Sequence, residues 1–153
     1  NLMTGYIDVG RFDEAIAMGQ RNLAARRSLY GTNHPEIATA LNNLATAFEP
    51  AGRYEDALPL YHESQEVRHT LYPDGHPSIL TAANNLGTLY SRLGRNEEAR
   101  ELFIEVAAGQ RALGNRSLLG RTLANLGTIT ARGGLASRCW PEVVPTFMVP
   151  SPV

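Results

Sequence analysis

The chain has 153 residues, of which 43% are hydrophobic, and its formal charge at neutral pH is −1. A charge so close to zero provides no overall field to hold nucleic acid or an anionic membrane, so neither is expected as a partner. Cys139 is the single cysteine, which excludes an intrachain disulfide and favours a reducing, cytoplasmic location. No apolar run reaches the roughly 20 residues that a membrane-spanning helix needs.

The sequence repeats itself with a period of 42 residues. The segment GRFDEA at 10–15 returns as GRYEDA at 52–57 and as GRNEEA at 94–99. His34-Pro35 returns in the same way as His76-Pro77. A fixed period of this length is typical of one small supersecondary unit stacked several times, so the sequence predicts a solenoid. Function is then expected on a surface that the repeats share.

The first residues of the chain lie within a repeat. Residues 1–6 are in register with residues 43–48, which fall halfway along a repeating element. We therefore expect the chain to be a fragment that begins with a partial repeat over residues 1–34.

Each full period contains two helical patterns, and the first is called helix A. Leu41, Leu44 and Phe48 are spaced for one helix face. His34-Pro35 predicts the start of this helix, because a polar side chain precedes a proline that tolerates the first helical position. Gly52 predicts its end, because glycine suits a left-handed C-terminal cap. The matching residues of the next copy are Leu86, Tyr90, His76, Pro77 and Gly94.

The second pattern, helix B, is predicted to run from about Tyr54 to about Leu71. Its inward face is predicted to carry Tyr54, Ala57, Leu58, Tyr61 and Ser64. Two helices of this length joined by a tight glycine turn must pack antiparallel. A small residue recurs at one place in helix B, at Ala15, Ala57 and Ala99, where a larger side chain would hold the two backbones apart.

The third copy is shorter, because Leu86-Gly87 returns as Leu126-Gly127 after 40 residues. The sequence predicts a repeat array over residues 1–134. It consists of the partial repeat 1–34, the repeats 35–76 and 77–116, and a final helix A over 117–134. Residues 135–153 leave the register, and their prolines exclude a long helix, so a non-repeat Pro-rich tail is expected there.

The pattern of Leu86-Gly87, Tyr90, Gly94, Ala99 and Phe103 resembles the tetratricopeptide repeat. The ordinary repeat has a period of 34 residues. The extra length of this chain falls at residues 30–35 and 72–77, and this combination resembles the kinesin light chain type of repeat. The resemblance implies an all-α fold, a right-handed α-solenoid of antiparallel helix pairs.

The same resemblance implies a non-catalytic protein-protein interaction scaffold. Such a scaffold binds an extended peptide or partner segment, an acidic one included, in a concave groove lined by the A helices, as in kinesin light chain-like cargo or adaptor binding. An alternative remains open: the repeats form the C-terminal sensor or autoinhibitory arm of a multidomain signalling NTPase. The partner is then a larger parent chain instead of a kinesin-like complex.

A polar stripe runs along the A helices, away from their apolar face. Thr39, Asn43 and Thr46 are three or four residues apart, which places them on one side of a helix. The same spacing recurs at Thr81, Asn85 and Thr88, at Arg121, Asn125 and Thr128, and at Asn1 and Thr4. We call this set the polar stripe and treat it as the candidate peptide-binding site.

The asparagines of the polar stripe have two interpretations. The resemblance implies that Asn43, Asn85 and Asn125 hydrogen-bond the backbone of a bound peptide, which suits an amide that both donates and accepts. Arg121 then pairs with an acidic side chain or a terminal carboxylate. In the alternative, the asparagines hydrogen-bond between neighbouring A helices and only fix the stacking. The sequence leaves both open.

Catalytic signatures are missing from the sequence. It has no Gly-rich phosphate loop, nucleophile elbow or metal-ligand spacing. Its histidines form no tight ligand set; His34 and His76 are expected to cap helices, and His62 and His69 to lie on the surface. We therefore expect no enzyme activity, no cofactor and no metal.

Overall fold

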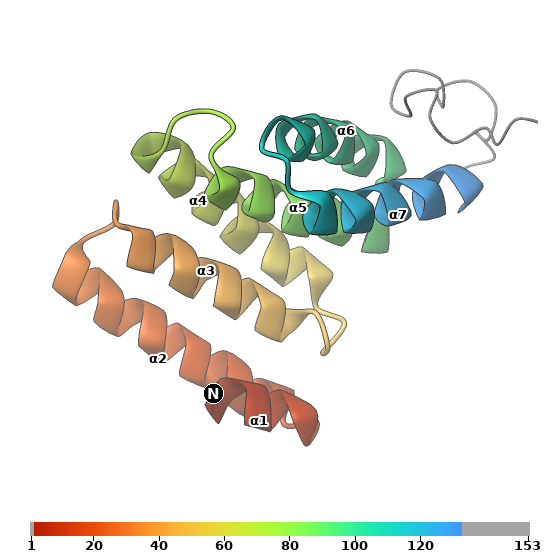
Figure 1. Ribbon diagram of the computed structural model, residues 1–153. Helices are drawn as coiled ribbons and strands as arrows, with labels where there is room; N and C mark the ends of the chain where they lie inside the picture. Colours follow the sequence, from red (N-terminus) through yellow and green to blue (C-terminus); the bar gives the residue numbers. More distant parts are fainter. Residues whose placement is uncertain (1, 133–153) are drawn as a thin grey trace, which may run out of the picture.

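The computed structural model describes residues 2–132, which form seven α-helices and no strand (Figure 1). Their bounds are α1 Leu2–Asp8, α2 Phe12–Tyr30, α3 Pro35–Phe48, α4 Tyr54–Leu71, α5 Pro77–Arg92, α6 Asn96–Ala112 and α7 Arg116–Arg132. Residues 1 and 133–153, which include the last two residues of the predicted final helix A and the Pro-rich tail predicted over 135–153, lie outside the described residues. The side chains of residues 2–4 and 132 are likewise not described.

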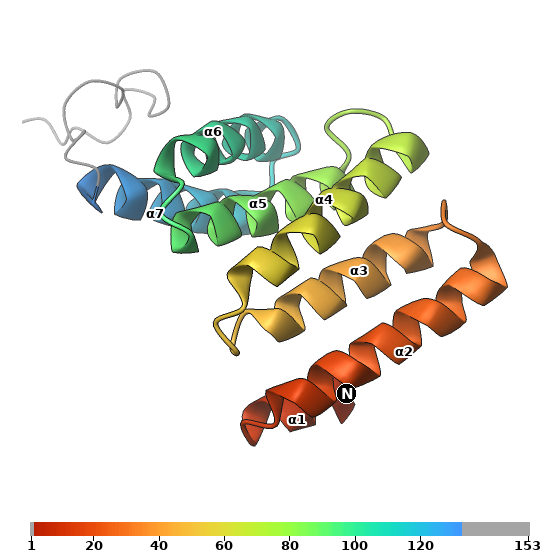
Figure 2. The ribbon, with the colours of Figure 1, turned by 180° about the vertical axis from the view of Figure 1, so that it is seen from behind.

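Successive helices pack against each other along the whole described chain. Helices α1, α3, α5 and α7 occupy the helix A positions of the sequence pattern, and α2, α4 and α6 occupy the helix B positions. Each helix contacts the next one in sequence, and α5 also contacts α7. Figures 1 and 2 show the resulting stack, in which helix pairs follow one another from α1 at one end to α7 at the other. The predicted all-α solenoid is confirmed.

The His-Pro connections cap the A helices as predicted. His34 Nδ1 accepts a hydrogen bond from the Glu36 backbone N–H at 3.2 Å, and His76 Nδ1 accepts one from Ser78 at 3.1 Å. A tyrosine of each preceding connection stacks on the histidine ring. The ring centroids are 4.4 Å apart for Tyr30 and His34, and 4.2 Å apart for Tyr72 and His76. The extra residues of the long period thus form a capping unit that holds each A helix at its start.

Replacing His76 with alanine removes both the cap and the ring stacking. We expect the variant to lose about 1 kcal/mol of unfolding free energy, the usual cost of deleting an N-cap side chain. His76→Asp keeps an oxygen acceptor for the Ser78 N–H and should lose less. Urea unfolding followed by circular dichroism measures both variants. An equal loss in the two would show that stacking on Tyr72, and not capping, carries the effect.

The Gly-Arg turn that recurs in each repeat has a physical explanation. Gly52 adopts φ +70°, a left-handed conformation that favours glycine, and the following Arg53 N–H donates to Phe48 O at 3.1 Å. The arginine after each such glycine lies over an aromatic ring in the last turn of the preceding A helix. The guanidinium-to-centroid distances are 5.0 Å for Arg11 and Tyr6, 4.8 Å for Arg53 and Phe48, and 4.4 Å for Arg95 and Tyr90. Each turn therefore joins helix A to helix B by a cation–π contact as well as by the chain.

The same arginines pair with a carboxylate three residues further on. The pairs are Arg11 with Glu14 at 2.7 Å, Arg53 with Asp56 at 2.7 Å, and Arg95 with Glu98 at 2.6 Å. The hydrogen bond from Arg95 lowers the pKa of the Glu98 carboxyl. One acidic residue after each glycine turn thus does more than face the helix dipole, because it is also paired with the arginine of that turn.

The core contains the recurring small residues and close approaches of helices at glycines. Ala15, Ala57 and Ala99 are fully buried, as predicted for the crossing of helices A and B. A Cβ atom at Gly87 of α5 would lie 2.9 Å from Cε1 of Phe103 on α6, so only glycine fits there without a shift. Gly127 occupies the equivalent place on α7 and has nothing within 4 Å of such an atom.

Candidate functional site

The structure places the described part of the polar stripe along α3, α5 and α7, with every side chain at least partly accessible. Thr39, Asn43, Thr46, Thr81, Arg121 and Thr128 are exposed, and Asn85, Thr88 and Asn125 are intermediate. The two stripe residues of the first partial copy, Asn1 and Thr4, have no described side chains.

The threonines of the stripe use their hydroxyl protons within their own helices. Each Oγ1 donates to the backbone carbonyl four residues earlier. The distances are 2.9 Å for Thr39, 2.9 Å for Thr46, 2.8 Å for Thr81, 2.9 Å for Thr88 and 3.0 Å for Thr128. A hydroxyl has one proton, so these groups retain only acceptor capacity for a ligand.

Thr46 also adjoins a polar network between α3 and α4. Its Oγ1 lies 3.1 Å from the Tyr61 hydroxyl, which donates to Glu49 Oε1 at 2.6 Å. Burial and this hydrogen bond raise the pKa of the Tyr61 hydroxyl, which stays protonated as a donor. Arg92 of α5 pairs with Glu49 at 3.3 Å. Thr46 therefore lies at the contact between α3 and α4 as well as on the polar stripe.

Asn85 bridges two neighbouring A helices. Its Nδ2 donates to Asn42 Oδ1 on α3 at 2.9 Å. One repeat later, Thr122 Oγ1 of α7 lies 3.2 Å from Asn84 Oδ1 of α5. The first asparagine of each Asn-Asn doublet thus contacts a polar side chain of the following A helix. Our sequence reasoning did not assign Asn42 or Asn84 a role, although their recurrence in the doublets at 42–43 and 84–85 was the available signal.

Asn43, Asn125 and Arg121 differ from Asn85. Within residues 2–132, none of these three side chains forms a hydrogen bond or an ion pair with the protein. Asn43 and Arg121 are exposed, and Asn125 is half-buried. Their amide and guanidinium groups are available to an external partner. Asn85 keeps its carbonyl oxygen and one N–H for the same purpose.

The described part of the chain has neither a metal-binding cluster nor a membrane-spanning helix. Among residues 2–132 no group of three or more His, Cys, Asp or Glu side chains could hold a metal ion. None of the described helices is long and apolar enough to cross a membrane. His62 and His69 are both exposed, as expected from the sequence.

The helix pairs and the accessible stripe define a helical-repeat protein of the α-solenoid class. The chain belongs to the tetratricopeptide repeat family, whose family model matches residues 4–68, 49–112 and 78–136. A search of curated protein sequences found no match.

The solved structures that resemble this fold contain kinesin light chain-like repeats. The nearly identical TPR-like repeats of a protein assigned as a kinesin light chain from Podosopora anserina align with a TM-score of 0.80 and 22% identity, over 87% of this chain and 64% of theirs. BtubC (BKLC) from P. vanneervenii aligns with a TM-score of 0.78 and 26% identity, over 87% of this chain and 54% of its own. The predicted right-handed solenoid of the kinesin light chain type is confirmed, and the chain spans less than two thirds of these structures.

Proposed function

We propose that this chain is a protein-protein interaction scaffold that binds an extended partner segment along the face formed by α3, α5 and α7, in a kinesin light chain-like adaptor role. Tetratricopeptide repeats are protein-interaction modules, and folds of this kind are typically non-catalytic. The observation that carries the proposal is the set of unengaged polar groups on the stripe. Asn43, Asn125 and Arg121 have hydrogen-bonding capacity that the described protein does not use.

The roles within the stripe follow from the contacts. Asn43 and Asn125 would hold peptide units of the ligand, because an amide offers a donor and an acceptor regardless of the ligand's side chains. Arg121, exposed on α7, would select an acidic side chain or a terminal carboxylate. Asn85 would combine stacking with binding, since only part of its amide is engaged by Asn42.

The stripe threonines Thr39, Thr46, Thr81, Thr88 and Thr128 would serve as acceptors or as spacers.

For the chain as a whole, we propose the division that the sequence indicates: a partial repeat over 1–34, repeats over 35–76 and 77–116, and a final helix A over 117–134. A cytoplasmic location accompanies this proposal, because the single Cys139 favours a reducing compartment.

Alanine variants of two equivalent asparagines test the proposal. Asn43→Ala should weaken binding to peptides selected from an immobilised array by about threefold to tenfold, the worth of one neutral hydrogen bond. It should leave the protein as stable or slightly more stable, because alanine has up to about 0.7 kcal/mol more helix propensity. Asn85→Ala forfeits the bond to Asn42 and should be about 1 kcal/mol less stable than Asn43→Ala.

Fluorescence anisotropy of labelled peptides and thermal melts measure these two quantities. Arg121→Gln should reduce binding of the acidic members of the array more than that of the neutral ones. If Asn43→Ala and Asn125→Ala bind every selected peptide as tightly as the parent protein, the stripe is not the binding site. A stability loss confined to Asn85→Ala would then assign the asparagines to stacking alone.

A further inference from the structure

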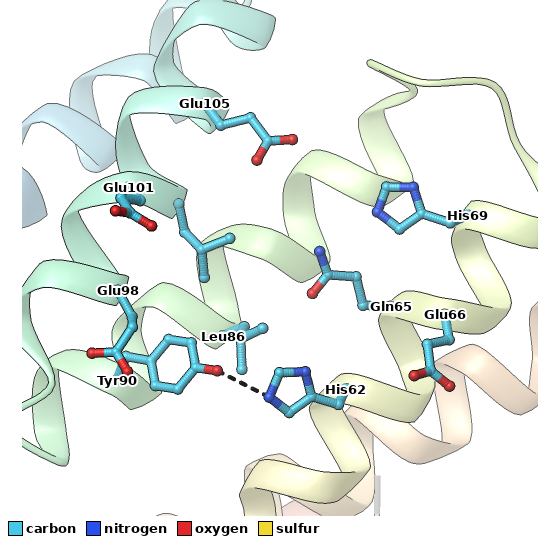
Figure 3. A pocket seen from close by; sticks show the side chains of 10 residues that line it. His62, Gln65, Glu66, His69, Leu86, Tyr90, Glu98, Glu101 and Glu105 are labelled. Atoms are coloured by element: carbon cyan, nitrogen blue, oxygen red, sulfur yellow. Dashed lines mark hydrogen bonds between the residues drawn. The ribbon is translucent and has the colours of Figure 1, made fainter.

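A second groove lies between the helix B elements α4 and α6, away from the polar stripe. Figure 3 shows α4 and α6 facing each other across it, with Leu86 and Tyr90 of α5 below. The hollow has a volume of about 530 Å³. Its lining residues are His62, Gln65, Glu66, His69, Leu86, Tyr90, Glu98, Glu101, Leu102 and Glu105. We call it the B-helix groove.

The floor of this groove is apolar and its rim is acidic. Leu86 and Tyr90 come from α5, and Leu102 from α6 packs beside the core. Glu98 is paired with Arg95, but Glu66, Glu101 and Glu105 form no ion pair within residues 2–132. On α4, His62 Nε2 lies 3.0 Å from the Tyr90 hydroxyl of α5. His69 Nδ1, also on α4, lies 3.7 Å from Asp74 Oδ1 in the connection that follows this helix. Among the described residues that line the groove, none is an arginine.

The preceding repeat shows how the equivalent groove is closed. Counting back 42 residues, the positions of His69 and Glu105 are those of Arg27 and Glu63. Arg27 of α2 and Glu63 of α4 form an ion pair across the first groove. Leu23, which is 6% exposed, occupies the position of Gln65 and is packed in the core. The first groove thus contains its own arginine and its own leucine.

The B-helix groove lacks the equivalent arginine and leucine, but it has the carboxylate that pairs with the arginine in the first groove. His69 stands where the arginine was, Gln65 stands where the leucine was, and Glu105 retains the carboxylate. The B-helix groove also has two carboxylates that the first groove does not, because Glu66 and Glu101 occupy the positions of Ala24 and Pro59. The result is a hollow with uncompensated negative charge at the place where, one repeat earlier, a guanidinium lies.

We propose that the B-helix groove binds an arginine side chain presented by a partner protein, in the way that Arg27 of α2 pairs with Glu63 of α4 one repeat earlier. The aliphatic stem of the arginine would lie on Leu86 and Leu102, and its guanidinium would pair with Glu105 and Glu101. A planar guanidinium suits carboxylates better than an ammonium does, because it donates two parallel hydrogen bonds. An apolar side chain next to the arginine would take the place that Leu23 occupies in the first groove.

A peptide titration followed by NMR tests the groove directly. The probe is the blocked tripeptide acetyl-Leu-Arg-Leu-amide, and its control contains citrulline, which has nearly the same shape without the charge. We expect the arginine peptide to shift the backbone amides of Gln65, Leu102 and Glu105. The citrulline peptide and the Glu105→Gln variant should each bind about tenfold more weakly, the lower end of what a hydrogen bond to a charged group contributes. Glu63→Gln, the matched change in the first groove, should bind the probe like the parent protein.

A second variant supplies the arginine within the chain itself. His69→Arg should close the groove on Glu105 and abolish probe binding. A double-mutant cycle of His69→Arg with Glu105→Gln should show a coupling similar to that between Arg27 and Glu63. If His69→Arg still binds the probe as tightly as the parent, or if citrulline binds equally well, the proposal is overturned.

Two controls separate this groove from the polar stripe and from self-association. Asn43→Ala should not change probe binding, so failure at the stripe and failure at the B-helix groove are distinguishable. Analytical ultracentrifugation detects any self-association. A dimer that Glu105→Gln dissociates would make a second copy of this chain the occupant, and would overturn the assignment to a different partner protein.

Discussion

Phe103→Ala is expected to lower the free energy of unfolding by about 3–5 kcal/mol, the largest single effect in the array. Phe103 is fully buried, and its ring fills the space that Gly87 leaves open on α5. Alanine would leave a cavity, because the surrounding helices relax only partly around a deleted side chain. Losing this contact between α5 and α6 should also loosen α7, since repeat stability depends on contacts between neighbouring units.

Urea unfolding followed by circular dichroism measures the loss, and hydrogen exchange locates it. Leu113→Ala is the matched control: it also truncates a large apolar side chain near the end of α6, but Leu113 is 50% exposed. It should change stability by less than about 0.5 kcal/mol. Equal effects of the two substitutions would contradict the packing assigned to Phe103.

Ala57→Leu is expected to destabilise the protein by about 1–3 kcal/mol, through overpacking where α4 crosses its neighbours. Ala57 is fully buried within the main core cluster, and its equivalents Ala15 and Ala99 are buried as completely. The added side chain would force α3 and α4 apart or push core residues out of their rotamers.

Ala17→Leu on α2 provides the control for this substitution. Ala17 lies on the exposed side of a helix B, two residues after the equivalent alanine, so the same change adds the same atoms without a clash. Its thermal melt should match that of the parent within experimental error. An unchanged melt for Ala57→Leu would show that the crossing tolerates a larger residue, against the tight packing described above.

The sequence predicted the helices of this molecule better than it predicted the contacts between them. The starts of α3 and α5 at Pro35 and Pro77 agree with expectation, because a cap and a proline act within a few residues of the chain. The final helix A begins at Arg116, one residue before the predicted start. There the His-Pro cap is replaced by Asn115, whose Oδ1 accepts from the Leu118 N–H at 3.2 Å.

The sequence predicted only part of the candidate site. Periodicity placed Asn43, Asn85 and Asn125 on one side of the A helices, and it left two roles open for all three. The structure separates them, since Asn85 donates to Asn42 while Asn43 and Asn125 have no such contact within the described residues. The Thr-Oγ1 bonds to the helix backbone likewise depend on rotamers that spacing does not determine.

By itself, the sequence determined the repeat, its subtype, the helix starts and the small residues of the crossing. All of these depend on short-range propensities or on a period that is visible in one dimension. The helix ends were predicted less well, because α3 ends at Phe48 and α5 at Arg92, before the glycines Gly52 and Gly94 that were expected to cap them. Only the tertiary structure decided which asparagine is engaged, and that the groove between α4 and α6 lacks the arginine of its predecessor. Those properties depend on side chains some 36 to 43 residues apart, such as Arg27 with Glu63 and Asn42 with Asn85. Stacking brings them together, and a single substitution at either end changes the contact without disturbing the period.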